Sequence, residues 1–233
     1  DPFLWDKISA EVLDIDPAYM IFSSGSTGKP KGILISHRSL IDFTEWMAEV
    51  SETDENDVLA NQAPFYFDLS VKDIYQTLRN GCTTYIIAKK LFMFPTLLVD
   101  WLNNHKVTSL IWATSAFRMV ADSGIFEKKR PQCLRQVILG GEALQAKHLN
   151  IWKKAAPECR FINLYGPTEV TVDCTYYKIE RDFADGEPIP IGKACRNMEV
   201  ILLGDDLKPV PDGEAGEICV RGVGLALGYF ADS

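Results

Sequence analysis

Residues 23–32 read SSGSTGKPKG and lie between two short apolar runs, 19–22 and 33–35. The segment combines three glycines, which permit tight turns and close backbone approach to a ligand, with four hydroxyl groups and two lysines. N–H, O–H and ammonium donors of this kind can surround a polyphosphate. The run that follows is too short and too β-branched for a helix, so we predict a flexible phosphate-binding loop at the tip of a β-hairpin.

This loop differs from the P-loop of nucleoside triphosphatases. In that motif Gly-Lys is followed by Ser or Thr, which binds magnesium. Here Pro30 follows Lys29, and a strand is expected where the P-loop has a helix. A polar surface turn is the alternative interpretation, but the ordered mixture of glycines, hydroxyls and lysines favours phosphate binding.

Composition argues against several classes of function. The chain has 233 residues, of which 47% are apolar, so a substantial core can form in one large domain or two small ones. The net charge of −8, without a long basic run, argues against nucleic acid as the main partner, and no apolar stretch is long enough to span a membrane. The six scattered cysteines include no C-x-x-C pair and are expected to be buried free thiols, which favours a cytoplasmic location.

Helical and strand patterns alternate through the first three-quarters of the chain. Helices are expected at 38–50, 69–79, 95–104, from 117 onward and at 144–156, and strands at 58–64, 83–88, 107–112, 137–139 and 160–164. This alternation is typical of βαβ units, so the fold class is α/β with a mostly parallel sheet covered by helices. Ligands bind beyond the carboxyl ends of the strands in such sheets.

Beyond residue 172 the pattern changes to short strands separated by turns. Strands are expected at 175–179, 199–203 and 217–221, in a β-rich, distorted barrel-like segment. The predicted organisation is therefore a central α/β part at 1–172 and a β-rich subdomain of the same domain at 173–233.

Three further segments carry polar residues near predicted strand ends. They are FDLS at 67–70, GGEA at 140–143 and NLYGPTE at 163–169. Together with 23–32, in this order and spacing, they resemble the adenylate-forming enzymes. That superfamily includes the amino-acid-activating domains of nonribosomal peptide synthetases, D-alanine–carrier-protein ligases, acyl-CoA synthetases and luciferases. Residues 213–222 and 228–229 resemble a further family segment, to which we assign no chemistry.

The resemblance implies a site for ATP or AMP and Mg²⁺. It places the nucleotide against Ser23, Ser24, Gly25, Ser26, Thr27, Gly28, Lys31, Gly141, Glu142, Ala143, Asn163, Leu164, Tyr165, Gly166, Pro167 and Thr168. In this arrangement Tyr165 stacks on adenine and Asn163 bonds the base. The catalytic residues are Thr168, whose hydroxyl meets the α-phosphate, and Glu169, whose carboxylate binds the metal. A plain βα turn remains the alternative for 140–143.

Asp68 separates the substrate classes. A carboxylate beside apolar side chains is suited to hold an ammonium group, since a low dielectric strengthens the ion pair, although a helix N-cap is the alternative. By resemblance, Asp68 binds the α-amino group of an amino acid. The same resemblance implies a side-chain pocket made by Leu69, Lys72, Trp112, Ile138, Gly140, Leu164, Val172 and Asp173. Lys72 and Asp173 would pair with each other or with a polar substrate, and Trp112 would narrow the pocket, which favours a small or polar amino acid.

The implied activity is ATP-dependent formation of an aminoacyl-adenylate, with release of pyrophosphate and transfer to a carrier-protein phosphopantetheine thiol. The family pattern continues with a ribose-binding segment, a hinge and a small lysine-bearing domain, none of which this sequence contains. The chain therefore resembles a fragment of the large amino-terminal domain. The alternatives are an acyl- or aryl-CoA synthetase, against which Asp68 argues, and a nucleotide-binding fragment without full turnover.

Overall fold

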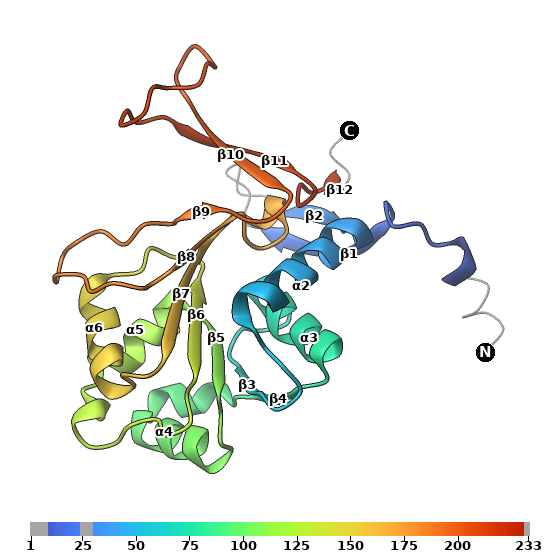
Figure 1. The fold of residues 1–233 in the computed structure, drawn as a ribbon. Coiled ribbons are helices and arrows are strands. Elements are labelled where there is room, and N and C mark those ends of the chain that lie inside the picture. Colours follow the sequence, from blue (N-terminus) through green and yellow to red (C-terminus); the bar gives the residue numbers. More distant parts are fainter. Residues whose placement is uncertain (1–8, 24–29, 231–233) are drawn as a thin grey trace.

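A seven-stranded sheet forms the centre of the computed structural model, which describes residues 9–23 and 30–230. Its strands are β3 (Val58–Asn61), β4 (Thr83–Ile86), β5 (Ser109–Ala113), β6 (Gln136–Gly140), β7 (Arg160–Tyr165), β8 (Thr175–Lys178) and β9 (Lys193–Ala194). They lie in the order β4-β3-β5-β6-β7-β8-β9 (Figure 1). The strands from β4 to β7 pair in parallel, and β8 and β9 pair antiparallel. The prediction of an α/β fold with a mostly parallel sheet is confirmed.

Helices cover both faces of this sheet (Figure 1). One face packs against α2 (His37–Ser51) and α3 (Leu69–Asn80), and the other against α4 (Pro95–Asn104), α5 (Thr114–Asp122) and α6 (Ala146–Ala155). Short 3₁₀ turns are η1 (Lys89–Met93), η2 (Ile125–Glu127) and η3 (Thr168–Val170). Successive strand residues point to opposite faces, so Ile111 packs towards α2 and α3 while Trp112 packs towards α5 and α6. Within the described ranges, no helix has the length and apolarity needed to cross a bilayer.

The first two strands form the predicted hairpin. β1 (Pro17–Ser23) and β2 (Lys31–Ser36) pair antiparallel, with Ser23 opposite Lys31 at the mouth of the turn. Five residues predicted to bind phosphate lie outside the described residues: Ser24, Gly25, Ser26, Thr27 and Gly28. Immediately after β2, Ser36 caps α2, because its Oγ accepts a hydrogen bond of 3.0 Å from the backbone N–H of Ser39.

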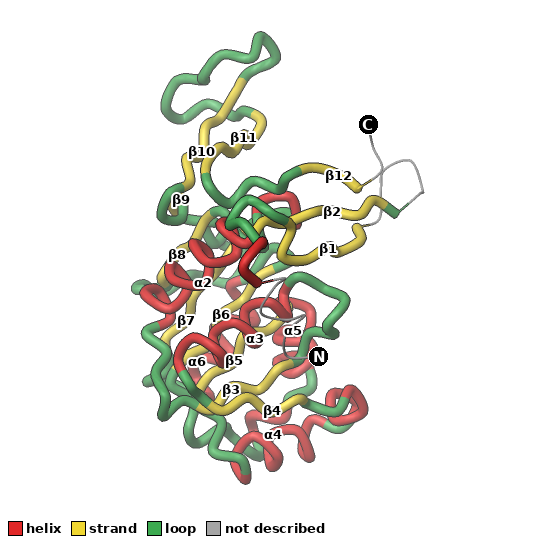
Figure 2. Tube along the Cα trace, turned by 90° about the vertical axis from the view of Figure 1, so that its right-hand side faces the viewer, coloured by secondary structure: helices red, strands yellow, loops and turns green. Residues whose placement is uncertain are grey.

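The β-rich segment contributes strands to three sheets. β8 and β9 extend the main sheet, and β12 (Gly228–Phe230) pairs with the free side of β2, which brings the far end of the chain beside the hairpin. β10 (Met198–Leu203) and β11 (Glu217–Gly222) form a two-stranded ribbon that projects from the body (Figure 2). The division into an α/β part at 1–172 and a β-rich subdomain at 173–233 stays a prediction.

Candidate functional site

A pocket of about 270 Å³ opens at the carboxyl ends of β6 and β7. Its lining includes seven of the residues predicted to contact a nucleotide: Gly141, Glu142, Ala143, Asn163, Leu164, Tyr165 and Gly166. The remaining lining residues are Leu144, Ile189 and Ile191. Sequence reasoning missed the two isoleucines, for which the short PIPI run at 188–191 was the available signal. The structure thus brings two separate predicted segments together at one pocket.

The turn that follows β6 contacts the first residues of α5 and α3. The buried hydroxyl of Thr114 donates to the carbonyl of Glu142 over 3.1 Å, and Gly141 adopts a φ of +92°, which favours glycine. A Cβ on Gly141 would lie 3.7 Å from Leu69, the first residue of α3. The turn therefore rests against the start of α3, where Asp68 lies.

The corner after β7 needs a glycine for steric reasons. A Cβ on Gly166 would lie 2.5 Å from the Cα of Asp173, closer than atoms can approach. The backbone N–H of Cys174 donates to the carbonyl of Tyr165 over 2.8 Å, so the chain leaves β7 at Gly166 and returns beside it. Pro167 and Thr168 lie in the segment between Gly166 and Cys174, and Tyr165 stays partly exposed at the pocket.

Asn163 has a protein partner in this structure. Its Nδ2 donates to the carbonyl of Pro190 over 2.9 Å, and this bond holds the segment with Ile189 and Ile191 against the pocket. The side chain is buried in the pocket wall. Its contact with a base stays a prediction, and its hydrogen bond gives it a role in shaping the pocket wall.

Lys31 and Glu169, predicted for phosphate and metal, both contact Tyr229. The Lys31 Nζ lies 4.7 Å from the centroid of the Tyr229 ring, and the Tyr229 hydroxyl donates to Oε1 of Glu169 over 2.9 Å. Sequence reasoning assigned no chemistry to the segment with Tyr229, because the contact spans 60 positions. Thr168 lies next to Glu169 in the same 3₁₀ turn.

A second pocket lies beside the first. It has a volume of about 250 Å³ and shares Gly141 and Glu142 with its neighbour. Its other lining residues are Gln62, Ala63, Pro64, Phe67, Leu69, Ala113 and Ser115. Of the predicted substrate residues only Leu69 is among them, so most of this wall was not identified from the sequence.

Asp68 is buried, with 7% of its surface exposed, at the start of α3. Asp68 occupies the N-cap position of α3, as the alternative interpretation expected, but its side chain makes no capping hydrogen bond to the helix. The hydroxyl of Tyr19 is buried nearby and has no hydrogen-bond partner among the described residues. Burial raises the pKa of Tyr19, and the carboxylates of Asp68 and Asp173 add to the shift. Tyr19 is a further polar residue of this region that sequence reasoning missed.

Lys72 and Asp173 form a buried ion pair. The Lys72 Nζ lies 2.8 Å from Oδ2 of Asp173, and their side chains are 1% and 3% exposed. A Cβ on Gly140 would lie 3.3 Å from Nζ and 3.6 Å from the Cβ of Leu164, so Gly140 leaves room for the pair. Burial raises the pKa of Asp173, and the Lys72 ammonium opposes that shift. Of the two predicted options, the structure has Lys72 and Asp173 paired with each other.

Ile138 and Val172 belong to the same core as Leu164, on the α2 and α3 face. Trp112 lies on the opposite face, fully buried, where its ring packs against Phe92 and Trp152. Its Nε1 donates to the carbonyl of Ala60 over 2.8 Å. The structure therefore does not bring Trp112 together with Lys72 and Asp173, and gives it a packing role instead.

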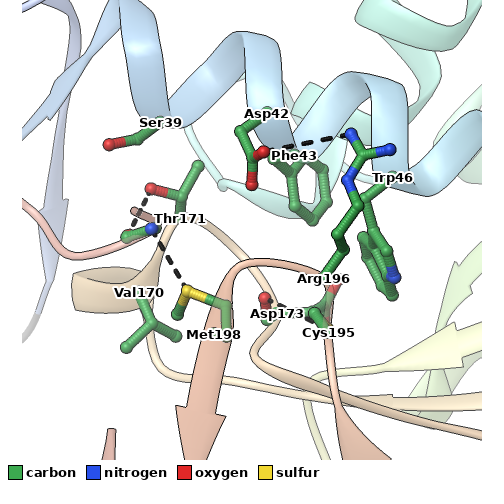
Figure 3. Close-up of a pocket in the computed structure, with 11 residues that line it drawn as sticks. Ser39, Asp42, Phe43, Trp46, Val170, Thr171, Asp173, Cys195, Arg196 and Met198 are labelled. Atoms are coloured by element: carbon green, nitrogen blue, oxygen red, sulfur yellow. Dashed lines mark hydrogen bonds and ion pairs between the residues drawn. The ribbon is translucent and has the colours of Figure 1, made fainter. Parts of the chain in front are cut away.

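Asp173 also lines a narrow pocket between α2 and the segment 195–198 (Figure 3). Arg196 reaches across it to Asp42 at 3.9 Å, and the hydroxyl of Thr171 donates to the carbonyl of Gly224 over 2.6 Å. Its volume of about 10 Å³ is the space of a single water molecule. This pocket is too small for a nucleotide or an amino acid. Its contacts join Arg196 to α2 and the corner after β7 to Gly224.

The donor set at Glu169 fits magnesium better than a transition metal. Among the described residues, no three His, Cys, Asp or Glu side chains are grouped as metal ligands. Magnesium is commonly bound through one or two carboxylates together with phosphates and water. A single carboxylate beside residues predicted to bind phosphate is compatible with that chemistry.

Comparisons with known proteins agree on one family. The profile of the AMP-binding enzyme family matches residues 6–230. The D-alanine–D-alanyl carrier protein ligase of Bacillus licheniformis is 35% identical over 221 residues, which cover 93% of this chain. The L-proline–[L-prolyl-carrier protein] ligase of Pseudomonas fluorescens is 35% identical over 219 residues, again 93% of this chain. The chain spans 43% of the length of each. The solved structure of the nonribosomal peptide synthetase FmoA3 matches with a TM-score of 0.85 and 26% identity. The match covers 94% of this chain and 23% of the FmoA3 chain.

Proposed function

Because the chain belongs to the AMP-binding enzyme family, we propose that it activates an amino acid with ATP, forming an aminoacyl-adenylate and pyrophosphate. The observation that carries this proposal is the pair of pockets that meet at Gly141 and Glu142. A nucleotide in the pocket at β6 and β7 and a small carboxylic acid in the second pocket would contact each other beside this glycine-rich turn. Such a meeting point at the carboxyl ends of parallel strands is where this fold class binds ligands.

In the proposed nucleotide site, adenine lies against Tyr165 and the turn at 141–143. The Thr168 hydroxyl donates to an oxygen of the α-phosphate, and Lys31 contacts the β- and γ-phosphates together with the loop at 23–28. Lys31 lies at the mouth of the hairpin, and Tyr229 contacts both Lys31 and Glu169. This arrangement supports the assignment. Magnesium, when bound at Glu169, supplies positive charge to the phosphates.

In the proposed substrate site, Asp68 holds the ammonium group of the amino acid. Its burial and the lack of a capping bond support this role, because a desolvated carboxylate binds a cation strongly. Lys72 and Asp173 neutralise each other, which supports a small, uncharged substrate side chain. Two relatives are named for D-alanine and L-proline, which are both small.

In the proposed reaction, a carboxylate oxygen of the amino acid attacks the α-phosphorus. A new P–O bond forms, and the bond to the β-phosphate breaks as pyrophosphate leaves with the electron pair. No proton has to move, so the chain contributes positioning and charge stabilisation. In a second step, a carrier-protein phosphopantetheine thiol would lose its proton to solvent and attack the acyl carbon, so that a C–S bond forms, the C–O bond to the phosphate breaks and AMP leaves. The names of the two carrier-protein ligases support a carrier protein as the partner.

Exchange of labelled pyrophosphate into ATP tests the proposal on the natural full-length protein. We expect exchange that depends on a small amino acid, while fatty and aryl acids support none. Asp68→Ala should weaken amino-acid activation roughly 100-fold or more and leave ATP binding nearly unchanged, because it removes the partner of a desolvated charge. Asp206→Ala, at an exposed carboxylate, is the matched control. Exchange with fatty or aryl acids alone would favour a CoA ligase, and equal loss of both ligands in Asp68→Ala would refute the role of Asp68.

A further inference from the structure

Tyr229 lies between a cation and an anion that come from different parts of the fold. Its ring lies 4.7 Å from the Lys31 ammonium at the start of β2, and its hydroxyl lies 2.9 Å from Oε1 of Glu169 in η3. The side chain is only partly exposed. One residue thus contacts both charged groups that the proposed function assigns to the phosphates and the metal.

The backbone around Tyr229 is held by two other elements, β2 and η3. Tyr229 lies opposite Ile33 in the β12–β2 pairing, and the N–H of Leu227 donates to the carbonyl of Leu34 over 2.8 Å. The N–H of Ala226 donates to the carbonyl of Glu169, also over 2.8 Å. The segment 224–230 therefore joins the hairpin to the corner after β7, and Tyr229 is held at the junction.

We propose that Tyr229 is a positioning residue that keeps Lys31 and Glu169 apart and orients the Glu169 carboxylate for a divalent cation. This inference rests on the proposed function and extends it to a residue outside the predicted site. Opposite charges close together would otherwise form a direct ion pair. Such a pair would occupy the ammonium that contacts phosphate and the carboxylate that contacts the metal.

The two contacts of Tyr229 act on different atoms. The hydroxyl fixes Oε1 of Glu169, and no other hydrogen bond to that carboxylate is formed by the residues the structure describes, so Oε2 is the oxygen that a cation would meet. The ring face attracts the Lys31 ammonium and holds it beside the proposed phosphate site. Loss of the hydroxyl and loss of the ring should therefore have separate consequences.

Calorimetric titration with ATP over a series of Mg²⁺ concentrations separates these consequences. Tyr229→Phe keeps the ring and removes the hydroxyl, so the Mg²⁺ concentration for half-maximal tightening of ATP binding should rise roughly 3- to 10-fold. ATP binding in EDTA, which is independent of the metal, should stay unchanged. Tyr229→Leu also removes the ring and should weaken ATP binding in EDTA roughly threefold, with AMP binding unchanged.

Tyr66→Phe is the matched control, because it removes the hydroxyl of a tyrosine that is 70% exposed. It should leave every titration as in the wild type. A merely structural Tyr229 would change the thermal unfolding temperature, or the affinities for ATP and AMP equally, without moving the Mg²⁺ midpoint. An unchanged midpoint in Tyr229→Phe, with ATP still bound by the wild type, would overturn this inference alone. Failure of the wild type to bind ATP would overturn the proposed function and this inference with it.

Discussion

Replacement of Lys72 by methionine tests the most buried charge of the candidate site. The methionine side chain has a similar length and no charge, so the variant removes the partner of Asp173 and little packing. Both side chains of the pair are at most 3% exposed, and their charged atoms are 2.8 Å apart. Breaking such a pair leaves one uncompensated buried charge, which typically costs about 3–5 kcal/mol of unfolding free energy.

Urea denaturation at neutral pH measures this loss, with Lys208→Met as the control. Lys208 pairs with Asp206 at 3.2 Å, but these side chains are 79% and 63% exposed, so the control should lose no more than about 0–1 kcal/mol. In Lys72→Met the pKa of Asp173 should lie well above its ordinary value of 3.8, because burial raises it and the opposing ammonium is gone. The folded state then binds more protons than the unfolded state above that pH, so the variant should lose stability as the pH rises from about 4.

A second substitution distinguishes charge from packing. Adding Asp173→Asn to Lys72→Met removes the uncompensated charge, so the double variant should lose less stability than Lys72→Met alone. The reasoning would be refuted if Lys72→Met lost no more stability than Lys208→Met, or if the double variant lost the sum of both single losses.

Two other predictions concern buried polar groups. Asp73 is fully buried, with Asn61 donating to its Oδ2, and burial raises its pKa from 3.8 to about 7. Its folded pKa is the higher one, so this group lowers stability progressively between pH 4 and 7, by roughly 4 kcal/mol at most from 1.36 kcal/mol per pKa unit. Asp73→Asn should flatten that part of the pH–stability curve, and an unchanged slope in thermal or urea melts would contradict this. Trp112→Phe should cost about 1–3 kcal/mol, through the lost bond to Ala60 and a cavity, and leave the amino-acid preference in pyrophosphate exchange unchanged. A changed preference would show that Trp112 acts on the substrate site.

Local patterns predicted the sheet, its helices and the first hairpin. The apolar runs of the inner strands and the helical patterns between them each depend on residues close in sequence. The hairpin β1–β2 follows from two apolar runs flanking a glycine-rich turn. Predictions of this kind succeed because strand, helix and turn preferences are local.

Contacts between distant segments were not predictable in the same way. β5 is buried on both faces, so its sequence has no polar alternation to tell that Trp112 faces α5 and α6 and not α3. The pairing of β12 with β2, which brings Tyr229 to Lys31 and Glu169, depends on the tertiary fold. Ile189 lies at the pocket beyond β6 and β7, where the hydrogen bond from Asn163 to Pro190 and the bridge between Gln145 and Pro188 hold its segment.

The central claim is that the pocket at the ends of β6 and β7 holds the base of a nucleotide. Photolabelling with an azido-adenine analogue of ATP, followed by mass spectrometry of the peptides, tests it most directly. The account predicts label on peptides that contain 141–144, 163–166 or 189–191, and competition by unlabelled ATP. Competed label confined to other peptides, such as the one with Tyr66 and Phe67 or the β10–β11 ribbon, would contradict it.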